Sequence, residues 1–446
     1  MNPSSEQLRG PGTPPPATSR REFLKRTGLL GAAVAVGGTS RITSVRPRPV
    51  SRDAAHQVTI DFWDMDWGGI ESTYEKAALS IVARYEKENP GVTVNYRVIP
   101  WTTFYEVFAT AIAAGTTPDI STGATFQGFQ YESSLIPLNS VVEEWKKNGT
   151  YTDLLPNTVQ AQTTAQGVVT GLPWEVDSRV IWYRKDFLRA EDIAPPTTMS
   201  QLLDASITLG KAGKGGFGFS GDTLGYQMLE SFFFNNGGSI IDAQGKPALT
   251  SARNVQVCEW IQDMVRGGGV PKQAPGWINT DVTSAFQNGE IAFYTGEPRD
   301  YTSAPSLGSN YALLSPVTGF HGDRGTVGWV SPIWLYKSSS NPTAATKFLV
   351  WWLANELPMW SEGTATPLPA RRSFYDIPAL ADPRVTLVRE KWLPISRIES
   401  YPSPATTWLN KFEGESFMPT LMQDILRLEK PQGALATAQS ALEQIM

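Results

Sequence analysis

The chain has 446 residues, of which 41% are hydrophobic and 18% charged, and its formal net charge is −5. This length exceeds what one compact core holds, so two domains or two lobes are expected. A single cysteine, Cys258, and two histidines exclude a disulfide framework and zinc sites built from several Cys or His ligands. We therefore expect neither a metal site nor a cofactor.

The first 55 residues are expected to be an export leader rather than part of the fold. Residues 1–18 are rich in Pro, Gly, Ser and Thr, which is typical of disorder. The heptapeptide Ser19–Lys25 (SRREFLK) resembles the twin-arginine export signal at every fixed position, and the weakly apolar Gly28–Gly38 follows it. No cysteine lies between this segment and residue 55. We expect a periplasmic or extracellular protein without a lipid anchor on cysteine.

The charge of the remaining chain excludes two further classes. Nine of the 38 Lys and Arg residues and three of the 43 Asp and Glu residues lie in the first 53 positions, so the rest has a net charge of −11. An acidic chain without basic runs argues against nucleic-acid binding. No later apolar stretch approaches about 20 residues, the length of a membrane-spanning helix.

Beyond the leader, strand and helix patterns alternate. Apolar residues at period two predict strands, those at helical spacing predict helices, and Asn89–Gly91 marks a helix end. The predicted order is strand Val58–Phe62, helix Ser72–Glu88, strand Val92–Val98, helix Trp101–Ala114 and a third strand near Ile120. This β-α-β-α-β order predicts a parallel sheet with helices on both faces.

Ligands of such sheets bind beyond the carboxyl ends of the strands. Three predicted loops meet there: Asp64–Gly69, which is dense in aromatic and acidic residues, Ser121–Phe126, and Trp174–Asp177. We expect these loops to lie near one another.

The stretch Gly171–Leu188 (GLPWEVDSRVIWYRKDFL) organises the chain. Its unbroken apolar run, Val180–Tyr183, predicts a strand buried on both faces. Glu175 and Asp177 precede that run and are expected at its mouth, because unpaired buried charge is costly. Taken alone, the stretch is equally well explained as a core strand with a polar entry.

The sequence resembles the family 1 extracellular solute-binding proteins of bacterial ABC importers, the maltose-binding-protein-like group. The landmarks occur in the family's order over nearly all of the exported chain. They are Tyr85–Val94 (YEKENPGVTV), Ala114–Ile120 (AGTTPDI), Gly171–Leu188, Phe234–Gly238 (FNNGG), Phe286–Phe293 (FQNGEIAF), Thr326–Lys337, Asn341–Leu349 and Thr366–Arg371 (TPLPAR).

The resemblance implies an α/β, two-lobe periplasmic-binding-protein fold of type II, with hinge strands between the lobes and the solute in the cleft. It places the crossings near Trp174–Arg179, Leu313–Pro316 and Leu353–Pro358. After the leader, residues 1–55, lobe one would comprise 56–174 with 315–355, and lobe two 178–313 with 356–446.

A sugar site needs carboxylates that accept hydrogen bonds from hydroxyls, and Trp or Tyr rings that stack on the sugar faces. The candidate residues that supply this mixture are Asp64, Asp66, Trp67 and Glu71 after the first strand, Phe126 after the third, Trp174, Glu175 and Asp177 at the first hinge, and Tyr226 before the helix Gln227–Phe234. The resemblance adds Gly328 and Trp329 on the returning strand, Arg371 of the P-x-R loop, and Trp408 as a closing aromatic.

One segment departs from the family pattern. After Phe286–Phe293 relatives often have G-P-W, whereas this chain has Gly296–Tyr301 (GEPRDY). Glu297 and Arg299 could bind hydroxyls or a charged group of the solute. They could instead pair with each other and be structural.

The function that the resemblance implies is capture of a carbohydrate outside the cell and its delivery to an ABC permease, by a monomeric protein that is not an enzyme. Two alternatives stay open. An exported carbohydrate-active enzyme could use Glu175 and Asp177 as acid and base. The same fold could instead bind a polyamine, an amino sugar or a phosphorylated polyol.

Overall fold

The computed structural model describes residues 57–446 apart from 68–71, 102, 125–126, 364 and 404–406. The predicted leader and the predicted site residues Glu71 and Phe126 lie outside these described residues. The described chain builds two sheets, one in the order β10-β4-β9-β3-β1-β2 with β11 beside β9, the other in the order β6-β7-β5-β8. The strands are β1 (Val58–Met65), β2 (Val92–Ile99), β3 (Ile120–Thr122), β4 (Leu172–Ser178), β5 (Val180–Arg184), β6 (Phe217–Gly218), β7 (Phe293–Gly296), β8 (Tyr311–Leu313), β9 (Thr326–Leu335), β10 (Leu368–Pro369) and β11 (Ser396–Arg397).

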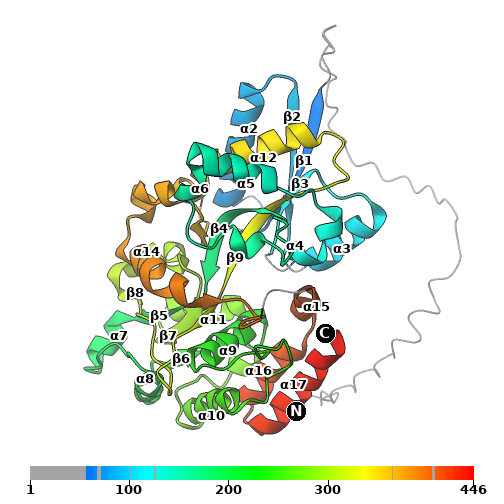
Figure 1. The fold of residues 1–446 in the computed structure, drawn as a ribbon. Helices are drawn as coiled ribbons and strands as arrows, with labels where there is room; N and C mark the ends of the chain where they lie inside the picture. The colour runs from blue at the N-terminus through cyan, green and yellow to red at the C-terminus, as the bar shows by residue number, and fades with distance from the viewer. Residues whose placement is uncertain (1–56, 68–71, 102, 125–126, 364, 404–406) are drawn as a thin grey trace, which may run out of the picture. The chain divides into compact units, whose positions relative to one another are not determined.

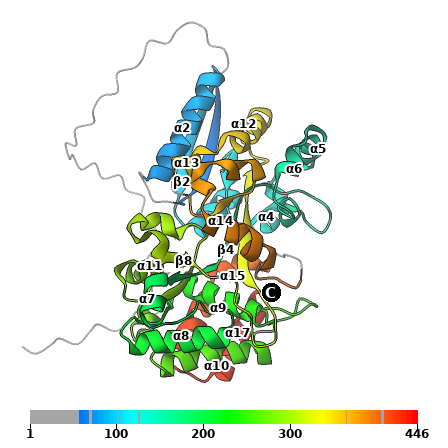
Figure 2. The same cartoon turned by 90° about the vertical axis from the view of Figure 1, so that its left-hand side faces the viewer.

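Helices surround each sheet (Figures 1 and 2). Those around the first sheet include α2 (Thr73–Glu88), α3 (Phe104–Ala114), α4 (Gln127–Gln130), α5 (Asn139–Asn148), α6 (Thr150–Asp153), α12 (Pro342–Asn355) and α13 (Pro358–Ser361). The remaining helices are α7 (Lys185–Ala190), α8 (Met199–Lys211), α9 (Thr223–Asn235), α10 (Ala252–Arg266), α11 (Asn279–Asn288), α14 (Pro383–Leu387), α15 (Trp408–Gly414), α16 (Phe417–Leu426) and α17 (Pro431–Ile445). No helix of the described ranges has the length and apolar character needed to cross a membrane.

The predicted parallel β-α-β-α-β unit is confirmed. Strand β1 pairs in parallel with β2 and with β3. Helix α2 begins where Ser72 Oγ accepts a hydrogen bond from Glu75 N at 3.1 Å, and it ends before Gly91, whose φ is +97°. The rest of the sheet is mixed, because β9 pairs antiparallel with both β3 and β4.

Strand β1 continues through Met65, so the predicted end of this strand at Phe62 is wrong. The sequence there looks polar, yet its side chains alternate between two cores. Met65 belongs to a cluster with Phe108 and Trp334, whereas Phe62 packs in T-shaped contact with Phe348 and Trp352. Asp64 stays in the strand because hydroxyl groups satisfy its carboxylate, as described below.

Where the chain first passes from one sheet to the other, a single residue separates the two strands. Strand β4 belongs to the first sheet, β5 to the second, and Arg179 is the residue between them. Arg179 N donates to Val327 O at 2.9 Å, and Thr326 Oγ1 donates to Arg179 O at 2.5 Å. The start of β9 therefore fixes the backbone of the crossing residue.

The last third of the chain contacts both sheets. Strand β10 pairs antiparallel with β4, and β11 pairs in parallel with β9. Helix α15 contacts both α17 and α4. Segments that follow residue 356 thus border the first sheet as well as the helices of the second.

Candidate functional site

Asp64 of β1 connects this strand with β2, β3 and helix α2. Its carboxylate accepts hydrogen bonds from Thr122 Oγ1 at 2.6 Å, Tyr96 Oη at 2.7 Å and Tyr74 Oη at 2.9 Å. Burial raises the pKa of Asp64 to about 6, and these hydrogen bonds oppose the rise. The side chain is only 1% exposed, so its hydrogen bonds to these three hydroxyls are largely buried.

An aromatic wall lies at the carboxyl ends of the strands, as the topology predicted. Trp67 follows β1, and its ring contacts Trp101 at a centroid distance of 4.9 Å and Trp174 at 5.6 Å. Trp174 also contacts Trp360 at 5.9 Å. Asp66 is partly buried beside this wall. The loop after β1 and strand β4 therefore meet, which confirms their expected proximity, and Trp101 and Trp360 are members that the sequence did not identify.

Two indole N–H groups of the aromatic wall have no hydrogen-bond acceptor among the described residues. The Nε1 atoms of Trp67 and Trp174 are buried and make no hydrogen bond to any described residue. Buried indole N–H groups usually have an acceptor, and one that lacks it is expected to bind a ligand or water. Apolar rings with free donors suit the alternating C–H faces and hydroxyls of a sugar.

The acids of β4 are buried inside the strand and not at its mouth, so that part of the prediction is wrong. Glu175 is 0% exposed and Asp177 is 6% exposed. Asp177 tolerates burial because Arg179 Nη1 lies 2.6 Å from its Oδ2. Burial raises the pKa of Asp177 to about 6, with Arg179 opposing, and burial followed by the charge of Asp177 raises the pKa of Glu175 well above its ordinary value.

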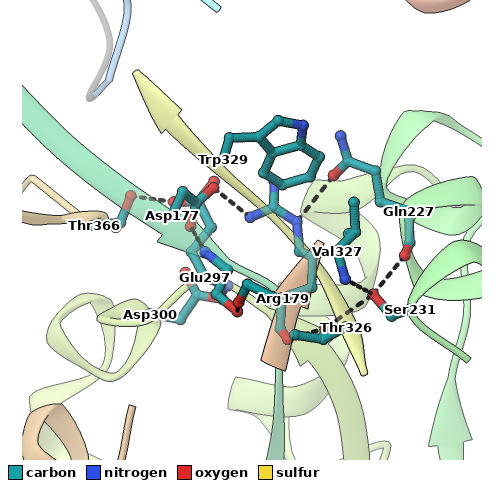
Figure 3. A network of polar contacts seen from close by, with 12 residues as sticks. Asp177, Arg179, Gln227, Ser231, Glu297, Asp300, Thr326, Val327, Trp329 and Thr366 are labelled. Carbon is teal, nitrogen blue, oxygen red and sulfur yellow. Dashed lines mark hydrogen bonds and ion pairs between the residues drawn. The ribbon is translucent and has the colours of Figure 1, made fainter. Parts of the chain in front are cut away.

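Arg179 is the centre of a polar network (Figure 3). Its guanidinium lies between Asp177 of β4 and Gln227 of α9, whose Oε1 accepts from Nε at 2.9 Å. Trp329 of β9 covers the guanidinium at 4.8 Å from the ring centroid. Because β4, α9 and β9 each contribute one contact, this residue joins two strands of the first sheet to helix α9.

Glu297 and Arg299 do not bond to each other within the described residues, so the predicted alternative of mutual pairing is wrong. Glu297 Oε2 accepts a short hydrogen bond from Thr366 Oγ1. Arg299 Nη1 donates to Ala365 O at 2.5 Å, and burial lowers the pKa of Arg299. Both residues thus tie their loop to the segment that precedes β10.

Two predicted aromatic residues bind carboxylates that the sequence analysis did not identify. Tyr226 lies within α9 rather than before it, and its Oη donates to Glu413 Oε2 at 2.6 Å. Trp329 Nε1 donates to Glu399 Oε1 at 2.8 Å. Neither glutamate belongs to a recognisable motif. The sequence could have indicated the position of Tyr226, because this residue lies on a helix that is buried and its side chain points into the interior.

The structure places the remaining predicted residues, Trp408, Gly328 and Arg371, among the following contacts. Trp408 begins α15, is 7% exposed and contacts Phe412. Gly328 allows β9 to approach β4, because a Cβ there would lie 2.6 Å from Asp177 O. Arg371 lies 3.5 Å from Asp153 and over the Trp145 ring. No group of three or more His, Cys, Asp or Glu side chains in the described ranges has the geometry of a metal site.

The comparisons with known proteins agree with this architecture. The model of the bacterial extracellular solute-binding protein family matches residues 71–357. The chain belongs to this family. Members of the family and its structural neighbours are binding proteins. The aromatic wall and the Arg179 network therefore occur in a chain of the solute-binding protein family.

Solved structures extend the similarity over both sheets. A sugar transporter from Arthrobacter chlorophenolicus A6, with bound laminaribiose, has a TM-score of 0.80 and 26% identity, covering 87% of this chain and 99% of that one. The maltose-bound MalE3 of T. maritima has a TM-score of 0.74 at 20% identity, covering 87% and 100%. The fold is therefore the two-lobe α/β fold of maltose-binding-protein-like receptors, as predicted.

The curated relatives match a smaller part of the chain. A candidate binding protein of Brucella abortus (strain 2308) is 26% identical over 276 residues, which is 59% of this chain and 65% of the relative. YcjN of Escherichia coli (strain K12), a candidate periplasmic-binding protein of an ABC transporter, is 25% identical, covering 62% of this chain and 60% of YcjN. The chain thus spans less than two thirds of the length of these relatives.

Proposed function

We propose that this protein captures a carbohydrate outside the cell for an ABC importer, as a binding protein and not as an enzyme. The observation that carries the proposal is the wall of Trp67 and Trp174, whose indole N–H groups have no acceptor among the described residues. The wall borders strand β4, which leads through Arg179 into the second sheet. A solute held there contacts elements of both sheets.

The proposed mechanism is a hinge closure that the solute favours. In the predicted division, lobe one comprises residues 56–174 with 315–355, and lobe two residues 178–313 with 356–446. Strands β10 and β11, which pair with β4 and β9, count against assigning all of 356–446 to lobe two. The passage from β4 to β5 at Arg179 supports the first boundary, and the change of sheet between β8 and β9 supports the second. A solute that contacts both lobes only in the closed form shifts the equilibrium toward that form. The closed monomer then presents both lobes to the permease.

The test of carbohydrate binding is a thermal-shift and calorimetric screen of mono- and oligosaccharides. A sugar that binds only the native state raises the melting temperature. Trp67→Ala should weaken binding of that sugar at least tenfold, an estimate based on removal of one stacking aromatic. The matched control is Trp351→Ala on α12, whose indole N–H bonds Glu88 and whose loss should leave affinity unchanged. Stabilisation by no sugar in the panel would overturn the proposal.

Binding is distinguished from catalysis by incubating the protein with the same oligosaccharides and analysing the products. Turnover of any of these oligosaccharides would exclude the assignment as a binding protein without catalytic activity.

Export by the twin-arginine route is tested by replacing Arg20 and Arg21 with Lys in the full chain. The double variant should accumulate inside the cell, whereas unchanged export would exclude that route.

A further inference from the structure

A small internal cavity lies beside Arg179, the residue between β4 and β5. Its volume is about 10 Å³, and its polar lining comes from Arg179, Ser231, Asn235, Thr295 and Thr326. None of these five residues is more than 7% exposed. The cavity therefore lies in the interior of the protein, where α9, β7 and the start of β9 meet.

Two polar atoms of the lining residues have no partner within the described part of the chain. Thr295 Oγ1 and Asn235 Nδ2 are buried and make no hydrogen bond to any residue there. The orientation of the Asn235 amide is fixed by its other atom, because Oδ1 accepts from Gly325 N at 3.4 Å. Burying a polar group without a hydrogen bond is destabilising. Two such groups beside one cavity indicate a shared partner.

The other hydroxyls of the lining are bonded within the protein (Figure 3). Ser231 Oγ donates to Gln227 O at 2.8 Å and accepts from Val327 N at 3.3 Å. Thr326 Oγ1 lies 3.2 Å from Ser231 Oγ and donates its proton to Arg179 O at 2.5 Å. Since a hydroxyl has two lone pairs, Thr326 Oγ1 can still accept a hydrogen bond.

We propose that this cavity binds a single water molecule, which joins α9 to β7 beside the crossing residue Arg179. A buried water needs roughly 10–15 Å³ and about two to four polar partners, and the volume of the cavity excludes a sugar. The water accepts from Asn235 Nδ2 and donates to Thr295 Oγ1 and Thr326 Oγ1. Each of these atoms then has a partner of the complementary kind.

The position of this site gives the water a role at the crossing between the sheets. Thr326, one of its partners, bonds the backbone oxygen of Arg179. Thr295, another partner, pairs with Ile181 of β5, two residues after Arg179. Asn235 is the last residue of α9. The water thus links the end of α9 to both groups that hold the chain where it enters the second sheet, and it stabilises this junction with or without solute.

The direct test is a high-resolution crystal structure of the protein without solute. We expect one peak of water density within hydrogen-bonding distance of both Asn235 Nδ2 and Thr295 Oγ1. A cavity without density, or side chains that close it by bonding each other, would overturn the proposal. Because no sugar is used, this result is independent of whether the protein binds carbohydrate.

The variant Thr295→Val tests the same site in solution, because it keeps the shape of the side chain and removes its hydroxyl. With a bound water, the change leaves the water and Asn235 with one partner fewer, and the melting temperature should fall by about 1–3 °C. Without a water, the change removes an unpaired buried hydroxyl, so the melting temperature should stay the same or rise. The two possibilities therefore predict different outcomes.

The matched control is Thr437→Val, the same change at an exposed position of α17. Its melting temperature should equal that of the parent protein, because solvent replaces the lost hydroxyl contact. A fall for Thr295→Val beyond that of the control, with the water density lost or displaced in crystals of the variant, supports the proposal. Equal melting temperatures of the two variants would refute it.

Discussion

The carboxyl of Asp64 gives a sharp test of how this protein accommodates buried acids. Its ordinary pKa is 3.8, and burial raises that pKa to about 6 in the folded state. The folded protein therefore binds this proton more tightly than the unfolded chain does. The stabilisation is complete below pH 3.8 and is lost as the pH rises through about 6. The difference between these two pKa values corresponds to about 3 kcal/mol in the free energy of unfolding.

Replacing Asp64 with Asn removes this titration while keeping a side chain of the same shape. We expect the stability of the parent relative to Asp64→Asn to fall by about 3 kcal/mol between pH 4 and pH 7. The three hydroxyls of Thr122, Tyr96 and Tyr74 can reorient, since each donates or accepts. Other acids titrate in both proteins and cancel in the difference.

The assay is urea denaturation at four pH values across that range, with unfolding monitored by tryptophan fluorescence. The matched control is Asp204→Asn, a change at an exposed position of α8, whose stability difference from the parent should be flat with pH. A flat difference for Asp64→Asn would refute the reasoning. It would mean that the hydrogen bonds, and not burial, decide the protonation of this carboxyl.

Three further changes test the site and its frame. Trp174→Ala should lower the free energy of unfolding by about 3–5 kcal/mol, since the ring is 2% exposed, and should abolish sugar binding at 25 °C in calorimetry, whereas Trp174→Phe should retain part of both. Gly328→Ala should cost about 1–3 kcal/mol in chemical denaturation, because its Cβ would meet Asp177 O at 2.6 Å; an unchanged midpoint would contradict that contact. Arg179→Met should cost about 3–5 kcal/mol by leaving Asp177 buried without its cation. Adding Asp177→Leu should restore part of that stability, and strict additivity of the two changes would argue against their pairing.

Most of the fold could be predicted because its signals are local. The helix α2 has a capping serine, a regular buried face and a glycine after its end, and the parallel β1–β2–β3 unit follows from the order of the elements. The extension of β1 through Met65 could not be predicted in this way. It depends on Phe108 and Trp334, which pack on that strand from distant parts of the chain.

The candidate site was predicted less completely, and for a related reason. Trp67 and Trp174 were identified because aromatic and acidic residues cluster in their loops. Glu399 and Glu413, which accept hydrogen bonds from Trp329 and Tyr226, belong to no motif, and their positions depend on how β11 and α15 pack. The burial of Glu175 was also missed, because the sequence does not show that β4 runs between β9 and β10.

The buried acids of this protein form a graded series according to what satisfies them. Asp64 has three hydroxyl donors, Asp177 has a guanidinium, and Glu230 has no hydrogen-bond partner in the described structure. The first two stabilise contacts between elements, which offsets part of the free energy that their burial costs. Glu230 makes no such contact, so in the solute-free protein it only costs stability. Stability alone would favour an apolar side chain of similar volume at this position of α9.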